Sequence, residues 1–180
     1  MSKPNSGLFA GTKGSKEVDE VKEIDQTLNS LLNPRLSEEG NELIQNVQNQ
    51  GLKISPDKVL NIGKMPNGKI VWIEEGKLTD KPSGLAHIWE KHSKEFSSLG
   101  IPKNEVPKFV IDVITKGSKV GIQGNHKEPR DVFEYNHKGK TIYLAVSTSN
   151  NGYIVGANFT TKIKRRINNE DNKIIIRGEL

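Results

Sequence analysis

The sequence contains no cysteine, and this absence excludes thiol catalysis, disulfide bonds and zinc sites built from thiolates. It also contains no apolar run of the roughly 18 residues that a membrane-spanning helix requires. Residues 1–6 lack the apolar region of a signal peptide. We therefore expect no stable membrane association, and export of this protein would depend on something else to carry it.

Hydrophobic residues are scarce as well, at 33% of the 180 residues, and the mean hydropathy is −0.61. A chain of this length can still bury a core, either as one domain with a tail or as two small units. Gly, Ser, Lys and Asn dominate residues 1–18, which is the composition of a flexible linker. We expect the folded part to begin near residue 19.

Acidic residues become scarce only in the second half of the chain. Residues 1–100 hold 13 lysines and arginines and 14 acidic residues, whereas residues 101–180 hold 14 and 8. A basic half on a small chain indicates an anionic partner, with nucleic acid as the first candidate and an acidic protein as the second. The alternative is that the surface lysines only keep the chain soluble.

Residues 19–80 are predicted to form a helical and β-hairpin segment. Apolar residues at helical spacing predict a helix over 17–32, and Ser37 is a typical N-cap for a second helix that stops at Gly51. Short strands are predicted at 52–54, 59–62 and 69–74. The last two are joined through Asn67-Gly68, a pair that supplies the positive φ angles of a tight hairpin. Residues 70–73 are apolar on both faces and should be buried.

Residues 81–180 are predicted to form an α+β domain. Ser83 is expected to cap one helix and Asn104 a second, in which Pro107 lies in the first turn. The second helix should end at Lys116-Gly117, with a cation at the negative helix terminus and a glycine that is able to take a left-handed conformation. An antiparallel meander follows, with strands at 119–123, 131–135, 141–148 and 153–159, and residues 173–177 form a last strand or an ordered tail.

Two of the four histidines and a lysine fall within six residues of the helix that starts at Ser83. Advancing each residue by about 100° places His92 on the apolar stripe, while His87 and Lys91 stand four apart on the other side. This helix is a candidate place to handle phosphate and protons. The ordinary interpretations are a core histidine at 92, a solvated histidine at 87 and a surface lysine at 91.

Three segments together resemble a known nuclease group. They are residues 84–92 (Gly-Leu-Ala-His-Ile-Trp-Glu-Lys-His), the helix end at 115–117 (Thr-Lys-Gly), and residues 151–158 (Asn-Gly-Tyr-Ile-Val-Gly-Ala-Asn). This combination is similar to the group named for barnase, EndoU, colicin-type tRNases and RelE (the BECR group). The resemblance covers about residues 83–162. It implies a small antiparallel sheet with helices on one face, RNA on the other, and RNA cleavage that needs no metal or other cofactor.

Cleavage through the ribose 2′-hydroxyl needs a base, an acid and a cation beside the phosphate. Histidine suits both proton transfers, so we predict His87 and His92 for them, Lys91 for the phosphate, and Thr148 and Thr160 for hydrogen bonds to phosphate oxygens. Further substrate contacts are predicted at His126, Arg130, Asn158, Lys162, Lys164 and Arg165. The four histidines show no metal-ligand spacing, so we predict no metal site.

Members of the group occur as C-terminal toxins of contact-dependent inhibition (CdiA-CT) and other polymorphic toxin systems. The resemblance therefore implies a toxin ribonuclease, with tRNA as its first candidate substrate, that is delivered as part of a larger secreted or cell-surface protein and acts in the target-cell cytoplasm. It also implies a cognate immunity protein and a host helper such as elongation factor Tu, and either of them could dock on residues 19–80. The alternative is a non-catalytic nucleic-acid- or protein-binding module. A deaminase or transferase toxin is disfavoured because no zinc or nucleotide-cradling glycine motif is present.

Overall fold

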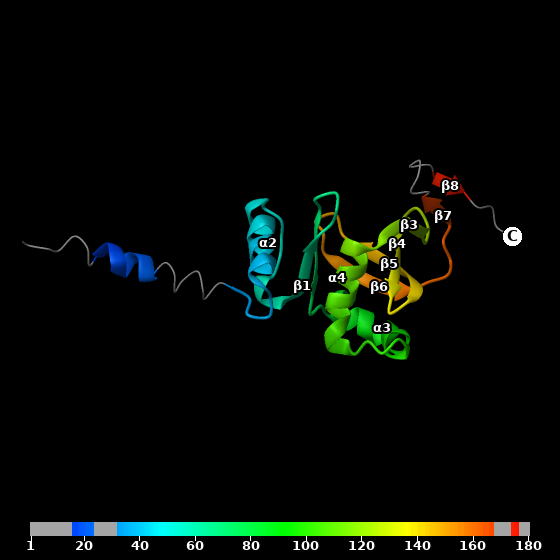
Figure 1. Cartoon of the computed structure of the whole chain (residues 1–180), viewed down its shortest axis with the longest axis horizontal. Helices are drawn as coiled ribbons and strands as arrows, with labels where there is room; N and C mark the ends of the chain where they lie inside the picture. Colours follow the sequence, from blue (N-terminus) through cyan, green and yellow to red (C-terminus); the bar gives the residue numbers. More distant parts are fainter. Residues whose placement is uncertain (1–15, 24–31, 168–173, 177–180) are drawn as a thin grey trace, which may run out of the picture. The chain divides into compact units, whose positions relative to one another are not determined.

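A computed structural model describes residues 16–23, 32–167 and 174–176 of the chain (Figure 1). The chain divides into two compact units, Met1–Leu32 and Asn33–Leu180. Residues 16–23 of the first unit are helical, as predicted, whereas the rest of the predicted 17–32 helix up to residue 31 and residues 1–15 of the predicted linker lie outside the described residues. None of the helices in these ranges has the length and apolar character needed to cross a membrane.

The second unit has an α+β fold with two antiparallel sheets, which confirms the predicted class. One sheet is the hairpin of β1 (Val59–Lys64) and β2 (Ile70–Glu74). The other has six strands in the order β6-β5-β4-β3-β7-β8. The bounds of these strands are Ser118–Gln123 (β3), Arg130–His137 (β4), Lys140–Thr148 (β5), Ile154–Phe159 (β6), Arg165–Ile167 (β7) and Ile174–Ile176 (β8). The predicted meander is β3 to β6, whereas β7 was not predicted.

Helix α2 (Glu38–Asn49) begins where the sequence predicts. The Ser37 side chain accepts a hydrogen bond from the backbone N–H of Gly40 at 3.2 Å, and Gly51 follows the helix with a φ of 71°. The predicted strand at 52–54 is wrong. Leu52 and Ile54 pack against the core beneath α2 instead of joining a sheet, and a short 3₁₀ helix, Pro56–Lys58, leads into β1.

The hairpin is buried on both faces, which confirms the prediction for residues 70–73. Trp72, with no exposed surface, packs with Ile44 and Val47 of α2 on one face. Val71 and Ile73 point the other way, into the core shared with α3 (Gly84–Ser98) and α4 (Val106–Lys116). Figure 1 shows α2 and α4 on opposite sides of β1.

The hairpin turn differs from the predicted one in its backbone. Gly68 has a φ of 88°, but Asn67 does not have a positive φ. The turn instead closes with a bond from the N–H of Gly68 to the carbonyl of Met65 at 2.8 Å, and the side chain of Asn67 accepts from the N–H of Lys69 at 3.0 Å. A single left-handed glycine therefore suffices for this turn.

Helix α4 departs from its predicted ends. Asn104 lies in a 3₁₀ turn (Lys103–Glu105), and Glu105 occupies the N-cap position, so the predicted Asn104 cap is wrong; Pro107 lies in the first turn, as predicted. Gly117 ends the helix, as predicted, but with a φ of −79° it does not use the left-handed conformation that glycine allows. A Cβ atom at Gly117 would lie 2.4 Å from the carbonyl oxygen of Val113 and 2.7 Å from that of Glu134. The glycine is needed for this close approach, through which α4 runs directly into β3.

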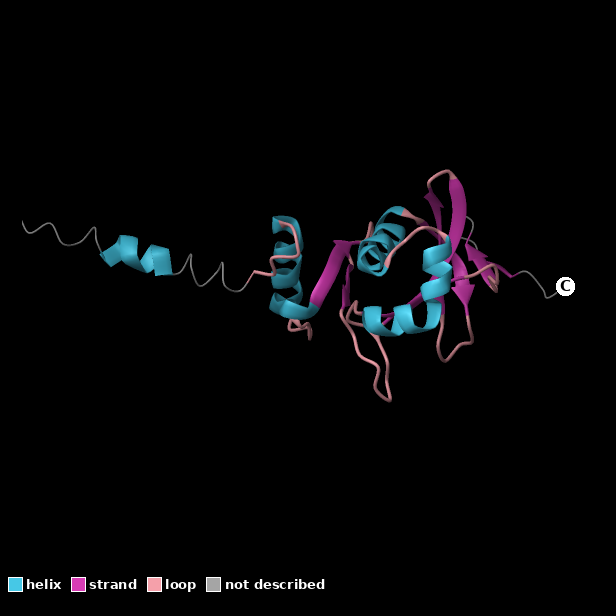
Figure 2. Ribbon diagram, turned by 90° about the horizontal axis from the view of Figure 1, so that it is seen from below, coloured by secondary structure: helices cyan, strands magenta, loops and turns pink. Residues whose placement is uncertain are grey.

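The large sheet carries its helices on one face. Ile142, Leu144 and Val146 share that face by strand alternation, as predicted, and join one core with Phe96 of α3 and Phe109 of α4. Figure 2 shows the helices and the strands of this unit from a second direction. The opposite face of β5 carries Tyr143, Ala145 and Ser147.

The hairpin core gives a direct test of this architecture. Trp72→Ala removes the largest fully buried side chain and should lower the free energy of unfolding by about 3–5 kcal/mol, because the cavity cannot close between two fixed layers. Urea denaturation followed by circular dichroism measures it. Leu78→Ala, at a side chain that is 56% exposed, is the control and should change stability by less than about 0.5 kcal/mol. Equal effects of the two substitutions would contradict the buried hairpin.

Candidate active site

Helix α3 and the edge strand β6 lie side by side and are joined at both ends. The hydroxyl of Tyr153, just before β6, donates to Ser83 Oγ at 3.0 Å. This contact replaces the predicted side-chain cap, which Ser83 does not form. At the other end the backbone N–H of Phe159 donates to a carboxylate oxygen of Glu95 at 3.1 Å. The histidines of α3 are therefore held at a fixed place along β6.

His87 lies against Gly156 of β6. A Cβ atom at Gly156 would be 3.5 Å from Cδ2 of His87, which is ordinary van der Waals contact, and 3.2 Å from Oγ of Ser147, which is tighter. The imidazole of His87 is therefore in contact distance of the strand backbone at Gly156. The Nδ1 atom of His87 is buried and has no hydrogen-bond partner among the described residues.

The environment of His87 favours the neutral ring. Burial lowers the pKa of His87 below 6.5, and the positive charges of His92, Lys91 and Arg130 lower it further, against a small opposite effect of Glu90. The groups that lower the pKa of His87 therefore come from two elements, α3 and β4. A neutral imidazole at pH 7 has a nitrogen lone pair that can accept a proton.

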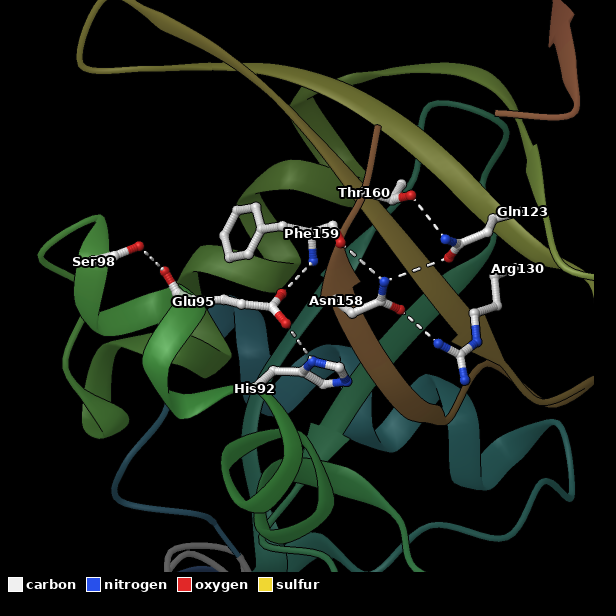
Figure 3. A network of polar contacts seen from close by, with 8 residues as sticks. All are labelled: His92, Glu95, Ser98, Gln123, Arg130, Asn158, Phe159 and Thr160. Atoms are coloured by element: carbon white, nitrogen blue, oxygen red, sulfur yellow. Dashed lines mark hydrogen bonds and ion pairs between the residues drawn. The ribbon is translucent and has the colours of Figure 1, made fainter. Parts of the chain in front are cut away.

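His92 is paired with a carboxylate on its own helix. Its Nδ1 atom lies 2.8 Å from Glu95, and its side chain is 24% exposed (Figure 3). The other oxygen of the same carboxylate accepts from Phe159, so Glu95 fixes both the ring of His92 and the end of β6. With Nδ1–H on the carboxylate, Nε2 is the atom that His92 presents to a substrate.

A chain of amide and guanidinium contacts lies beside these histidines. Nη1 of Arg130 donates to Oδ1 of Asn158 at 2.5 Å, and Nδ2 of Asn158 donates to Oε1 of Gln123 at 3.4 Å. Gln123 in turn donates to the hydroxyl of Thr160 at 2.7 Å (Figure 3). Asn158, at 9% exposure, is buried beneath the group. The network holds one edge of the guanidinium and leaves its remaining donors available for a phosphate.

The structure brings together six of the predicted site residues: His87, Lys91, His92, Arg130, Asn158 and Thr160. They come from α3, β4 and the end of β6, which are distant in sequence. Lys91 is the most exposed of the charged groups, at 57%, and Nζ lies 4.0 Å from Glu90. Thr160 already accepts hydrogen bonds from Gln123 and from the backbone of Lys162, so it supports the network.

The side chains of the other predicted residues form no hydrogen bond or ion pair with this group in the part of the chain that the structure describes, although the backbone of Lys162 bonds Thr160. Thr148 follows Ser147 on β5, so alternation points it toward the opposite face. His126 is exposed on the loop between β3 and β4. Lys162 and Lys164 are exposed beyond β6, and the side chain of Arg165 in β7 lies outside the described residues.

Two residues of the site, Glu95 and Gln123, were not predicted from the sequence. Glu95 stands three residues after His92, a spacing at which helix side chains meet, and this signal was available. Gln123 ends β3 in a polar stretch, where nothing in the local sequence marks it. Only the sheet register, which sets Gln123 opposite Arg130, shows its place.

A shallow cleft of about 470 Å³ adjoins the group where β6 ends. Glu95, Phe159 and Thr160 line it together with Tyr143 and Lys140 of β5. Aromatic side chains next to a proton-transfer group provide a surface on which a base of single-stranded RNA can stack.

No cluster of three or more metal-binding side chains occurs among residues 16–23, 32–167 and 174–176. No protein-family model matches the sequence, and a search of curated proteins gives no match.

The titration of His87 tests the electrostatics of the site. In an NMR pH titration the His87 imidazole should titrate below 6.5, and Lys91→Gln should raise its pKa because one of the cations that lowers it is removed. Lys94→Gln, which removes an exposed lysine from the same helix, is the control and should leave that pKa unchanged. Since the unfolded chain binds the proton more readily than the folded one, His87 should also reduce stability as the pH falls below 6.5. A pKa at or above 6.5 would contradict the assigned environment.

Proposed function

We propose that the protein is an endoribonuclease that cleaves RNA through attack of a ribose 2′-hydroxyl on the adjacent phosphate. The observation that carries this proposal is the convergence of His87, His92 and Arg130 beside Gly156 and Asn158 on one edge of the sheet. Two imidazoles in different environments and a held guanidinium are the groups that this reaction requires. The basic second half of the chain supports an RNA substrate.

In the proposed mechanism His87 accepts the proton of the 2′-hydroxyl, whose oxygen then bonds to phosphorus. The P–O bond to the 5′-oxygen breaks, and His92, protonated on both ring nitrogens, donates the proton of Nε2 to that oxygen, which gives a 2′,3′-cyclic phosphate and a 5′-hydroxyl. Arg130 stabilises the charge that develops on the phosphate, with Lys91 as a second cation at the rim. Glu95 orients His92, and Asn158 orients Arg130.

The resemblance of residues 83–162 to the BECR nucleases extends this proposal to a BECR fold and to a biological role. In that role the protein is a toxin delivered into competitor bacteria as the tip of a larger protein, with tRNA as its substrate and a cognate immunity protein as its inhibitor. Elongation factor Tu is the proposed host helper. The α+β fold with helices on one face of an antiparallel sheet is compatible with this assignment.

The cleavage reaction can be tested on purified protein with total RNA in EDTA. His87→Ala and His92→Ala should each slow cleavage by about 10²- to 10⁴-fold, since each removes one proton transfer. Lys94→Gln, on the same helix, should cleave at the wild-type rate. Products should carry cyclic phosphate and 5′-hydroxyl ends, as read by end-specific ligation and sequencing. Wild-type protein that retards RNA without cutting it would contradict the proposal and favour a binding module.

Glu95→Gln tests the orientation of His92. If the amide oxygen keeps the bond from Phe159, its NH₂ group faces Nδ1, so Nδ1 must stay unprotonated. The neutral imidazole then carries its proton on Nε2, and the doubly protonated ring that acts as the acid is disfavoured. We expect kcat to fall by about 10²-fold or more with little change in KM, and ¹⁵N shifts of His92 to report the exchanged tautomer. Glu42→Gln, at an exposed position on α2, is the control. A loss of thermal stability with no change of tautomer would show a structural role only.

A further inference from the structure

A second and larger cleft, of about 700 Å³, lies at the other end of the α3–β6 contact. Its walls are the segment before β1, the segment after β2, and the turn that connects β5 to β6. The side chain of Asn151 in that turn donates to the carbonyl of Lys53 at 3.2 Å, across 98 residues of sequence. A pair of backbone bonds between Lys77 and Ser83 at 3.0 Å closes the remaining side. The cleft is therefore fixed by contacts within the fold.

The cleft is positively charged. Lys53, Lys58 and Lys77 line it, all three are exposed, and none forms an ion pair within the described part of the chain. Its one carboxylate is Glu74, whose Oε1 accepts from the N–H of Ser55 at 3.0 Å and from the indole of Trp72 at 3.1 Å. Three ammonium groups against one carboxylate leave the hollow with a surplus of two positive charges, which favours a ligand with more than one negative charge.

The hydroxyl groups of the cleft add hydrogen bonds to this charge. Ser83 accepts from Tyr153, and its own proton remains available to a ligand. Burial raises the pKa of Tyr153 above 10, so its hydroxyl stays protonated and uncharged at neutral pH. The lining also contains Ser55, Ile54 and Asn150, which give it both polar and apolar surface.

The cleft lies on the same seam as the catalytic group. Ser83 and Tyr153 line it, and His87 follows Ser83 by four residues, which is about 6 Å along the helix axis. That separation corresponds to about one or two nucleotides of a strand. A single strand that runs along α3 and β6 would thus place one phosphate between the histidines and the next ones among the lysines.

We propose that this cleft is a phosphate-binding subsite for the RNA strand, which holds the nucleotides next to the cleaved bond. The proposal rests on the proposed ribonuclease function. Lysines contact phosphates without reading bases, so the subsite contributes affinity and a minimum substrate length, and it adds little sequence preference.

The test measures binding of a single-stranded hexanucleotide with 2′-O-methyl riboses, which cannot be cleaved, by fluorescence anisotropy between 50 and 200 mM salt. The cleft variant is Lys53→Gln, Lys58→Gln and Lys77→Gln together. The control variant, Lys64→Gln, Lys69→Gln and Lys138→Gln, removes the same charge from exposed lysines that line neither cleft. Circular dichroism verifies that both are folded.

We expect the cleft variant to bind at least about tenfold more weakly at 50 mM salt. The slope of the logarithm of its binding constant against the logarithm of the salt concentration should be smaller in magnitude by about 2. The affinity of the control variant should stay within about twofold of wild type. Equal losses in the two variants would overturn the proposal. So would competition by inorganic phosphate or a mononucleotide that equals competition by the hexanucleotide, because the cleft would then take a free small anion. Since this measurement needs no cleavage, failure of the subsite and failure of the ribonuclease assignment are separate results.

Discussion

Two hydrogen bonds, from Tyr153 to Ser83 and from Phe159 to Glu95, fix α3 along β6, and the proposed chemistry depends on this pairing. A helix advances about 1.5 Å per residue and a strand about 3.3 Å, so the 12 residues from Ser83 to Glu95 and the six from Tyr153 to Phe159 both span close to 20 Å. The two elements match in length. The two bonds therefore fix the register between α3 and β6 for the side chains that face the seam.

The site separates its two imidazoles by environment. His87 lies among cations over a strand glycine, whereas His92 lies against a carboxylate that also binds the backbone of β6. Two of the residues that hold these groups also have two roles each. Asn158 and Glu95 are side chains that orient a functional group and secure β6 at the same time, so changes at either position affect geometry and packing together.

Local sequence signals predicted much of the fold and failed where distant contacts decide the structure. The Ser37 cap, the buried residues 70–73 and the meander follow from spacing and turn chemistry. Ser83 begins a helix as expected, but its hydroxyl bonds Tyr153, 70 residues away, and no local rule anticipates that. Gly117 has an extended backbone, and glycine is required there because a Cβ atom would lie 2.4 Å and 2.7 Å from two carbonyl oxygens, one of them on the distant strand β4.

The candidate site shows the same division. The concentration of His87, Lys91 and His92 is visible in the sequence, and helical periodicity places these residues on one element. Arg130 and Asn158 were predicted as separate substrate contacts, whereas their bond to each other depends on the register of three strands. Thr148 is one residue after Ser147 on β5, and consecutive side chains of a strand point to opposite faces of the sheet. The face on which Thr148 lies therefore depends on its position in the strand and not on its residue type.

The β1–β2 hairpin, which is covered on both faces, limits how far the protein can be shortened from its N-terminal side. Trp72 donates its backbone N–H to Gly152 at 3.1 Å, and Val71 and Ile73 fill the core from which α3 is supported. A shortened protein that starts at residue 81 would expose the apolar underside of α3 and release the turn before β6. The smallest fragment that folds should therefore start upstream of the hairpin, close to Asn33.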